Sequence, residues 1–291
     1  MKELKQITVV GLGLLGGSIT LAVSRTFAGV KTVGYSHRSV TRRKARQLAV
    51  ATEIADDIGK SVSNADLVIL ATPIGMFEKI FGEISDALPN GCIVTDVGST
   101  KVLPHQWAAK KLPETVYYVG SHPIAGSEQR GIEFARDDLF ERAVCILTTT
   151  KKTNREAVQT LKKFWSRLGG CVKLMRPAEH DRILANVSHL PHITAAALMN
   201  ASSIKELPFA GKGFVDMSRI ASSQANIWAD VLATNANNIA GSIDKITAEL
   251  GKLKKAIKNG NKKQIEKLLK TARSKRSALI KYKIRKKEII S

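Results

Sequence analysis

Three glycines near the N-terminus have the spacing of a phosphate-binding loop. They follow the short apolar run 7–10 as G-x-G-x-x-G, and an apolar stretch with helical period begins directly after them. In this context the first glycine permits a tight turn, the second lets a pyrophosphate approach the backbone, and the third lets the helix pack closely on the strand. The free N–H groups of the first helical turn suit an anion. The residues expected to contact a dinucleotide here are Gly11, Gly13, Leu14, Leu15 and Gly16.

The end of the next predicted strand, 31–36, bears on the choice between NAD and NADP. A carboxylate about twenty residues past the glycines would bind the ribose 2′-hydroxyl of NAD and repel a 2′-phosphate. That position is Ser36, followed by His37 and Arg38, and no acid occurs before Glu53. A hydroxyl and a guanidinium suit a phosphate. NADP is therefore the preferred cofactor, and NAD remains open if Arg38 is merely exposed.

Polar residues follow three further apolar runs that read as strands. Thr72 and Pro73 end the run 65–71, where the chain is expected to turn over the cofactor. Ser99 follows the strand 91–96, and His122 follows the short strand 117–120. Ligands of parallel α/β sheets bind outside the carboxyl ends of the strands. Ser99 and His122 are therefore expected where chemistry occurs, although Ser99 has the alternative role of capping the helix after it.

The other histidines are less distinctive. Ser188 and His192 lie four residues apart on one face of a predicted helix, and His189 lies beside them. A zinc site at His189 and His192 lacks a third ligand at any recognised spacing, so no metal is expected. His105 and His180 are interpreted as surface residues because their settings are polar and no partner is near them in sequence.

The elements that must position these residues change character once along the chain. Residues 1–176 alternate strands and helices, which predicts an NAD(P)-binding α/β domain with a Rossmann-type doubly wound parallel sheet. Residues 177–291 show helical period alone and predict an all-α substrate and dimerisation domain. Its expected helices are 181–200, kinked at Pro191, then one long helix over 227–257 that ends at Asn259-Gly260, and a last helix over 265–287.

Composition narrows the class of protein. With 291 residues, 44% hydrophobic residues and no apolar run of about 20 residues, the sequence is typical of a globular chain without a membrane span. It has no N-terminal signal peptide pattern, and its three scattered cysteines fit a reducing cytoplasm. The net charge of +21 is concentrated in 252–287, where Glu266 is the only acid. We interpret this as a solvated helix face, which makes a nucleic-acid partner unlikely because only one aromatic residue accompanies it.

Taken together, five segments resemble the prephenate and arogenate dehydrogenase family of tyrosine biosynthesis. They occur in the family's order over nearly the whole chain. The combination of His-Pro-Ile-Ala-Gly, within 121–128, and Ser-His-Leu-Pro-His, 188–192, is specific to that family. The matching segments are 11–18 (GLGLLGGS), 96–101 (DVGSTK), 121–128 (SHPIAGSE), 188–192 (SHLPH) and 213–220 (GFVDMSRI).

The resemblance implies oxidative decarboxylation of prephenate, to 4-hydroxyphenylpyruvate, or of arogenate, to tyrosine, with hydride transfer to NADP or NAD. It implies that His122 is the base for the ring hydroxyl and that Ser99 orients the same hydroxyl. A neutral imidazole is a suitable base at neutral pH. The substrate-binding residues that it implies are Ser127, Glu128, Ser188, His192 and Arg219. Arg219 would bind a carboxylate, with an ion pair to Asp216 or Asp230 as its alternative role, and Glu128 would help to gate the pocket. The alternative for His192 is a hydrogen-bonded core histidine. It also implies a homodimer formed through the C-terminal helices.

Departures from the family pattern leave other interpretations open. The acid of NAD-dependent members is absent at Ser36, and no chorismate mutase segment or regulatory ACT segment is expected in this sequence, so feedback by tyrosine would act near the active site. One alternative is another Rossmann-plus-helical oxidoreductase for a β-hydroxy acid or an imine. A second is a dinucleotide-sensing protein whose basic helical tail binds nucleic acid.

Overall fold

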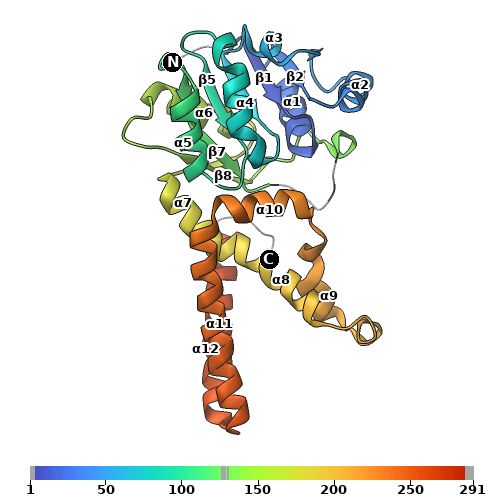
Figure 1. Ribbon diagram of the computed structural model, residues 1–291, viewed down its shortest axis with the longest axis vertical. Helices are drawn as coiled ribbons and strands as arrows, with labels where there is room; N and C mark the ends of the chain where they lie inside the picture. The colour runs from blue at the N-terminus through green and yellow to red at the C-terminus, as the bar shows by residue number, and fades with distance from the viewer. Residues whose placement is uncertain (1–3, 126–128, 130, 286–291) are drawn as a thin grey trace. The chain divides into compact units, whose positions relative to one another are not determined.

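The computed structural model describes residues 4–125, 129 and 131–285 (Figure 1). The chain divides into two compact units, Met1–Ala236 and Asn237–Ser291.

The first unit is built on a parallel sheet of six strands in the order β3-β2-β1-β4-β5-β6. The strands are β1 (Gln6–Val10), β2 (Lys31–Tyr35), β3 (Glu53–Ala55), β4 (Leu67–Leu70), β5 (Ile93–Asp96) and β6 (Tyr117–Tyr118). Every neighbouring pair is parallel. The order reverses direction at β1, which is the Rossmann-type topology. The predicted α/β fold with a doubly wound sheet is confirmed.

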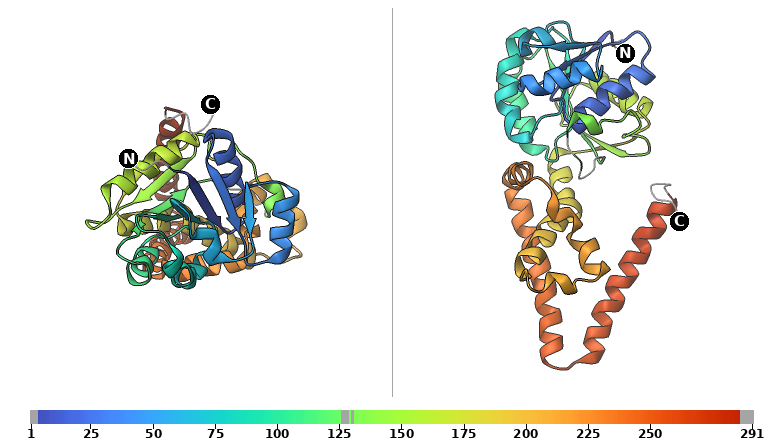
Figure 2. Two further views of the ribbon diagram at one scale, coloured as in Figure 1. Left: turned by 90° about the horizontal axis from the view of Figure 1, so that it is seen from above. Right: turned by 90° about the vertical axis from the view of Figure 1, so that its right-hand side faces the viewer.

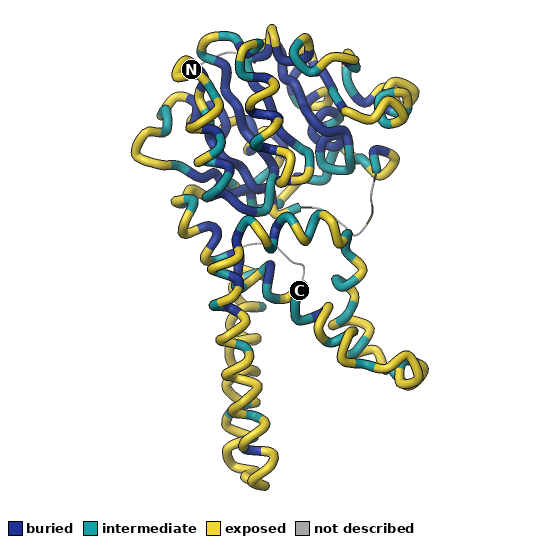
Figure 3. Tube along the Cα trace, in the orientation of Figure 1, coloured by how far each residue is buried: buried dark blue, intermediate teal, exposed yellow. Residues whose placement is uncertain are grey.

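Helices cover both faces of this sheet (Figures 1 and 2). Successive side chains of a strand point to opposite faces, so Leu67 and Ile69 of β4 enter one core cluster and Val68 and Leu70 the other. The first cluster includes residues of α1 (Leu14–Thr26) and α6 (Arg155–Arg167); the second includes residues of α3 (Ile58–Val62), α4 (Phe77–Ile84) and α5 (Val102–Lys111). Figure 3 shows the central strands buried between these layers. The connection after β2 contains α2 (Ser39–Gln47), and those around α4 contain the 3₁₀ turns η1 (Ile74–Met76) and η2 (Ser85–Ala87).

The last three strands form a separate sheet in the order β7-β8-β9. They are β7 (Gly120–Pro123), β8 (Val144–Thr148) and β9 (Cys171–Met175), with η3 (Ile132–Phe134) between the first two. β7 pairs antiparallel with β8, and β8 pairs parallel with β9. The predicted single strand 117–120 and its continuation in one parallel sheet are therefore wrong. The N–H of Val119 still donates to the carbonyl of Val94 in β5, but from Gly120 onward the backbone pairs with β8.

A helical segment follows β9. α7 (Pro177–Leu184) starts four residues earlier than predicted, with proline in its first turn, where a missing N–H costs nothing. A π-helical segment (Ala185–His189) separates α7 from α8 (Leu190–Ala201). The irregularity thus precedes Pro191, which lies in the first turn of α8. Shorter elements follow: η5 (Leu207–Phe209), α9 (Lys212–Ser218), η6 (Arg219–Ser222) and α10 (Ala225–Thr234).

The predicted single helix over 227–257 is interrupted at Asn235. Its backbone has φ −128° and ψ 28°, outside the helical region, and separates α10 from α11 (Ala236–Lys258). The Asn235 side chain is buried and donates to the carbonyl of Asp181 at 2.8 Å. Apolar periodicity continues across the break, so the sequence pattern alone does not reveal it.

The second unit contains most of α11 and the following helix, α12 (Lys262–Arg285). Gly260 adopts φ +60° in the turn between them, as the predicted Asn259-Gly260 stop requires. The two helices diverge from that turn (Figure 2). Leu250, Ile257 and Leu269 are each more than half exposed. Among the residues that the structure describes, no helix is both long and apolar enough to cross a membrane.

Candidate active site

The glycine loop between β1 and α1 has the geometry that its spacing predicts. Gly11 has φ +105°, and a Cβ there would lie 2.6 Å from the Ala71 backbone. A Cβ on Gly16 would lie 1.8 Å from the Gly11 carbonyl oxygen, so α1 packs directly on the loop. Around Gly13, in contrast, no atom of the described chain beyond its immediate sequence neighbours lies within 4 Å of an added Cβ. The first and third glycines are required by the protein itself, while the second leaves open space.

Two observations support dinucleotide binding at this loop. Gly13 is the residue before α1, so the first N–H groups of that helix lie beside the open space, and Leu14 and Leu15 supply them. Thr72, which follows β4, has a buried hydroxyl oxygen without a hydrogen-bond partner among the residues that the structure describes. Buried polar groups are normally satisfied, so this orphan indicates a ligand contact. Pro73 follows it and precedes η1.

The ribose edge lies between β2 and α2. Ser36 is buried, whereas His37 and Arg38 are exposed at the start of α2. The guanidinium of Arg42 donates to the carbonyl of Ser36 at 2.7 Å and pairs with Asp56. The first turn of α2 contains no acidic residue. Its N-terminus therefore presents N–H groups beside basic side chains, an arrangement that favours an anion.

His122 on β7 is 8% exposed and belongs to a buried hydrogen-bonded chain. Its Nδ1 lies 2.9 Å from Nε2 of His180, and Nδ1 of His180 lies 2.8 Å from Oδ1 of Asp181. His180 and Asp181 are both essentially unexposed. The interpretation of His180 as a surface residue without a partner is therefore wrong. Helical spacing was the available signal, because His180 and the apolar Leu184 share one buried face of α7.

The expectation that His105 is a surface residue is also wrong. It lies on α5, largely buried, with Nε2 2.9 Å from the Thr148 hydroxyl and its ring at the edge of Tyr118. Burial lowers the pKa of His105 to about 4. It is a hydrogen-bonded core histidine rather than a surface residue.

The start of α5 is fixed by buried charges. The carboxylate of Asp181 accepts from the N–H groups of Lys101 and Val102 at 2.7 and 2.8 Å. The ammonium of Lys101, fully buried, pairs with Asp96 at 2.5 Å, and Asp96 also accepts from the hydroxyl of Tyr118. Asp181 therefore caps the N-terminus of α5. Capping of this helix was the alternative role considered for Ser99.

His189 is a further buried histidine that the sequence interpretation considered only as a metal ligand. Its Nδ1 bonds to the Asn235 amide at 3.2 Å, and among the described residues no group lies in hydrogen-bonding geometry with its Nε2. Burial lowers the pKa of His189 to about 4, with the backbone of Ser99 acting in the opposite direction. Ser99 in the β5–α5 loop and His189 are therefore neighbours. The described residues contain no group of three side chains able to hold a metal.

His192, one turn along, lies at a second cluster. Its ring stacks on Trp228 of α10 with 3.5 Å between centroids. Burial lowers the pKa of His192; the Ile220 backbone raises it, and the charge of Arg219 lowers it further. His192 and Arg219, far apart in sequence, are thus brought together, while Ser188 is half-buried in the π-helical segment.

Electrostatics favour neutral imidazoles throughout this region. Burial lowers the pKa of His122 well below its ordinary value, and the charges of His180, Lys101 and His189 act in the same direction. Burial also lowers the pKa of His180, although its hydrogen bond to Asp181 opposes the shift. At neutral pH His122 therefore retains a lone pair and can accept a proton. Two predicted substrate residues, Ser127 and Glu128, lie outside the described residues.

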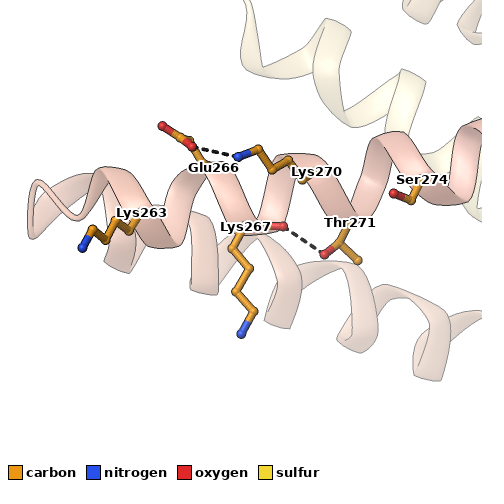
Figure 4. A pocket seen from close by; sticks show the side chains of 6 residues that line it. All are labelled: Lys263, Glu266, Lys267, Lys270, Thr271 and Ser274. Carbon is orange, nitrogen blue, oxygen red and sulfur yellow. Dashed lines mark hydrogen bonds and ion pairs between the residues drawn. The ribbon is translucent and has the colours of Figure 1, made fainter.

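A surface hollow of about 380 Å³ lies on α12, away from these histidines in the sequence (Figure 4). It is lined by Lys263, Glu266, Lys267, Lys270, Thr271 and Ser274. Glu266 pairs with Lys270 at 3.1 Å, and the Thr271 hydroxyl bonds to the Lys267 carbonyl. These side chains offer no histidine and no unpaired carboxylate for proton transfer. The groups suited to catalysis lie in the first unit.

Comparison with known proteins identifies two adjoining family regions. Residues 19–174 match "Prephenate dehydrogenase, nucleotide-binding domain", and residues 176–271 match "Prephenate dehydrogenase, dimerization domain".

Individual relatives agree with these regions. The chain is 34% identical to the prephenate dehydrogenase of Bacillus subtilis over 96% of this chain and 77% of that protein. It is 32% identical to the cyclohexadienyl dehydrogenase of Zymomonas mobilis over 88% of this chain and 90% of that protein. The crystal structure of Aquifex aeolicus prephenate dehydrogenase with hydroxyphenyl propionate and NAD+ has a TM-score of 0.89 at 31% identity, covering 96% of this chain and 99% of that one.

Proposed function

Because the chain belongs to the prephenate dehydrogenase family, we propose that the cluster around His122 performs that family's reaction on a cyclohexadienol. The protein is an NAD(P)-dependent dehydrogenase that oxidatively decarboxylates prephenate or arogenate in tyrosine biosynthesis. The observation that carries the assignment of the site is His122. It is a buried, neutral imidazole whose Nδ1 is hydrogen-bonded to His180, in the unit that also holds the glycine loop.

The cofactor's place is supported by the open space at Gly13 and the orphan hydroxyl of Thr72. When bound, a nicotinamide dinucleotide supplies the hydride acceptor of the reaction. The residues proposed to hold it, besides those of the ribose edge, are Gly11, Gly13, Leu14, Leu15, Gly16, Thr72 and Pro73.

We assign NADP as the preferred cofactor. Ser36, His37 and Arg38 occupy the ribose edge, and the start of α2 beyond them carries no acid. A 2′-phosphate would meet a hydroxyl, a guanidinium and helix N–H groups, while the carboxylate of Asp56 near this edge is already paired with Arg42 and Arg46.

His122 is proposed as the base for the ring hydroxyl. Hydride leaves the ring carbon that bears the hydroxyl, and His122 accepts the hydroxyl proton as the carbonyl character develops. The bond to the ring carboxylate then breaks, and its electron pair completes the aromatic ring as carbon dioxide departs. His122 returns the proton to the ring oxygen, so atoms and charge balance. Ser99, in the loop after β5, is proposed to orient the same hydroxyl.

The two carboxylates of the substrate require cationic and polar partners. Arg219 is proposed to bind one of them, because an exposed guanidinium forms bidentate bonds to carboxylates. His192, held against Trp228, and Ser188, four residues earlier, are proposed to position the other end. Ser127 and Glu128 remain proposed substrate residues.

For the assembly, we propose a homodimer formed through the helices of 177–291, with 1–176 as the cofactor-binding domain. The exposed Leu250, Ile257 and Leu269 of α11 and α12 offer apolar area for such an interface. We also propose the cytoplasm as its location, in keeping with three free cysteines.

The direct test measures reduced-cofactor formation by the purified protein with prephenate or arogenate, each combined with NAD or NADP. We expect turnover, with the higher kcat/KM for NADP. Equal or better use of NAD would contradict the cofactor assignment alone. No turnover in any pairing would contradict the proposed function. It would favour another hydroxy acid or imine oxidoreductase, or, with salt-dependent DNA binding, the dinucleotide-sensing alternative.

A further inference from the structure

The buried chain from His122 to Asp181 determines where its protons lie. The Asp181 carboxylate accepts from two backbone N–H groups of α5 and lies 2.8 Å from Nδ1 of His180. A carboxylate in this setting accepts, so Nδ1 of His180 carries a hydrogen and donates it. The N-terminus of α5 further stabilises the negative charge of Asp181.

The hydrogen position on His180 determines the one on His122. A neutral His180 that donates from Nδ1 has its lone pair on Nε2, so it accepts across the 2.9 Å contact with His122. Nδ1 of His122 must then carry the hydrogen, and Nε2 of His122 keeps the lone pair. Without such a partner, both neutral tautomers of an imidazole are accessible, and one of them has no lone pair on Nε2.

We propose that His180 and Asp181 are positioning residues for the reaction: they hold His122 in the tautomer whose Nε2 accepts the ring hydroxyl proton. This inference rests on the proposed function for its catalytic consequence, but the tautomer itself follows from the hydrogen bonds. The arrangement has the logic of the Asp–His pair of serine proteases, with one imidazole interposed.

The charges around His122 make this support necessary. When His122 gains a proton, the groups that face it include the buried ammonium of Lys101 and the imidazoles of His180 and His189. Asp96 is bonded to Lys101 and offsets that charge. The carboxylate bonded to His180 is Asp181, so the chain through His180 connects the new imidazolium to a negative charge.

Two substitutions of His180 separate positioning from packing. His180→Leu fills a similar space but neither accepts from His122 nor donates to Asp181. His180→Gln has an amide oxygen that accepts and an amide N–H that donates, so it can preserve both bonds. His105→Leu is the control, because His105 is half-buried and bonded to the Thr148 side chain but lies outside the hydrogen-bonded series from His122 to Asp181.

We expect His180→Leu to lower kcat by ~10²–10⁴, the scale on which loss of the orienting carboxylate acts in serine proteases. KM and the cofactor Kd should stay within about twofold, and His180→Gln should recover kcat to within about tenfold of wild type. His105→Leu should retain kcat. A His180→Leu protein with normal kcat would overturn the proposal, as would equal losses in the Leu and Gln variants.

A spectroscopic measurement tests the tautomer without turnover. In protein with ¹⁵N-labelled histidine, the signals of His122 are assigned by their loss in His122→Asn. We expect Nδ1 protonated and Nε2 unprotonated at neutral pH in wild type and His180→Gln, and loss of this preference in His180→Leu. An Nε2-protonated His122 in wild type would overturn the inference. If the protein gave the expected spectrum but turned over neither substrate, the tautomer inference would stand and only the proposed function would be contradicted.

Discussion

The two units of the chain differ in where their charged side chains lie: the first buries several of them, and the second exposes nearly all. Met1–Ala236 buries Lys101, Asp96 and Asp181 together with His122, His180 and His189. In the described part of Asn237–Ser291, every lysine, arginine and carboxylate is exposed except the half-buried Lys283. Burying a charge is expensive unless it is paired and hydrogen-bonded, and the first unit satisfies that condition at each group. The first unit therefore holds its buried charges in fixed, paired positions around the proposed site, whereas the second keeps its charges in solvent.

The largest effect should come from the proposed base. His122→Asn removes the group that accepts the hydroxyl proton, so kcat should fall by ~10²–10⁴ while the cofactor Kd is unchanged. Lys263→Ala on the exposed face of α12 should leave kcat unaltered. Steady-state kinetics and cofactor titration measure both. Near-normal turnover by His122→Asn would remove the base from the mechanism.

The same substitution made in both units should differ strongly in stability. Lys101→Met leaves Asp96 buried without its cation, which should lower the free energy of unfolding by about 3–5 kcal/mol. Lys270→Met breaks the ion pair between Lys270 and Glu266, which are 76% and 65% exposed. It should change the free energy of unfolding by less than about 1 kcal/mol. Urea denaturation of each variant provides the measurement. Similar losses in both would contradict the contrast between the units.

Acid should destabilise the first unit selectively, because all six histidines lie in it. Unfolded histidines bind a proton as pH falls through 6.5, whereas folded His105 and His189 stay neutral to about 4. The unfolded state therefore binds more protons in this window, and stability is lost as pH falls from 6.5 toward 4, by about 1.4 kcal/mol per pH unit for each histidine.

Tryptophan fluorescence reports this unit alone, since Trp107, Trp165 and Trp228 all belong to it. The urea midpoint followed by fluorescence should fall between pH 7 and 5, and the fall should be shallower in His105→Asn. A midpoint independent of pH over that range would show that these histidines are not held neutral by the fold.

Substrate affinity should depend on Arg219 rather than on the general positive charge. Arg219→Ala should raise KM by about 10- to 100-fold through loss of a charged hydrogen bond, with kcat within a few-fold. Arg273→Ala removes one charge from exposed α12 and should leave KM unchanged. If the two variants raised KM equally, nonspecific attraction rather than a binding contact would explain the effect.

The smallest expected effect concerns the ribose edge. Ser36→Asp should lower the preference for NADP over NAD by about tenfold, because the new carboxylate repels a 2′-phosphate. Lys263→Glu on exposed α12 also makes the protein more negative, by two charge units, and should leave the ratio of kcat/KM values unchanged. An unaltered preference in Ser36→Asp would mean that the 2′-position lies elsewhere.

Much of the fold was predictable because it depends on local patterns. The run 7–10 followed by three glycines specifies a strand, a turn and a helix; Gly16 is required by its contact with Gly11 nearby, whereas the close contact of Gly11 is with Ala71 of a distant segment. The break at Asn235 was not predictable in this way, since it depends on bonds to Asp181 and His189, far away in sequence. The second sheet likewise depends on pairing of Gly120 with Thr148, across 28 residues.

The sequence by itself determined the dinucleotide loop and the alternation of strands and helices, whereas His122, expected after a strand 117–120, lies within β7 of the second sheet. The loop and the alternation follow from steric and periodic rules that act over short stretches of chain. Only the tertiary structure decided that His180 and Asp181 are buried behind His122, and that His192 stacks on Trp228. Adjacent polar residues such as His180 and Asp181 are compatible with solvent or with a core, and the choice is made by whether distant segments supply hydrogen-bond partners there.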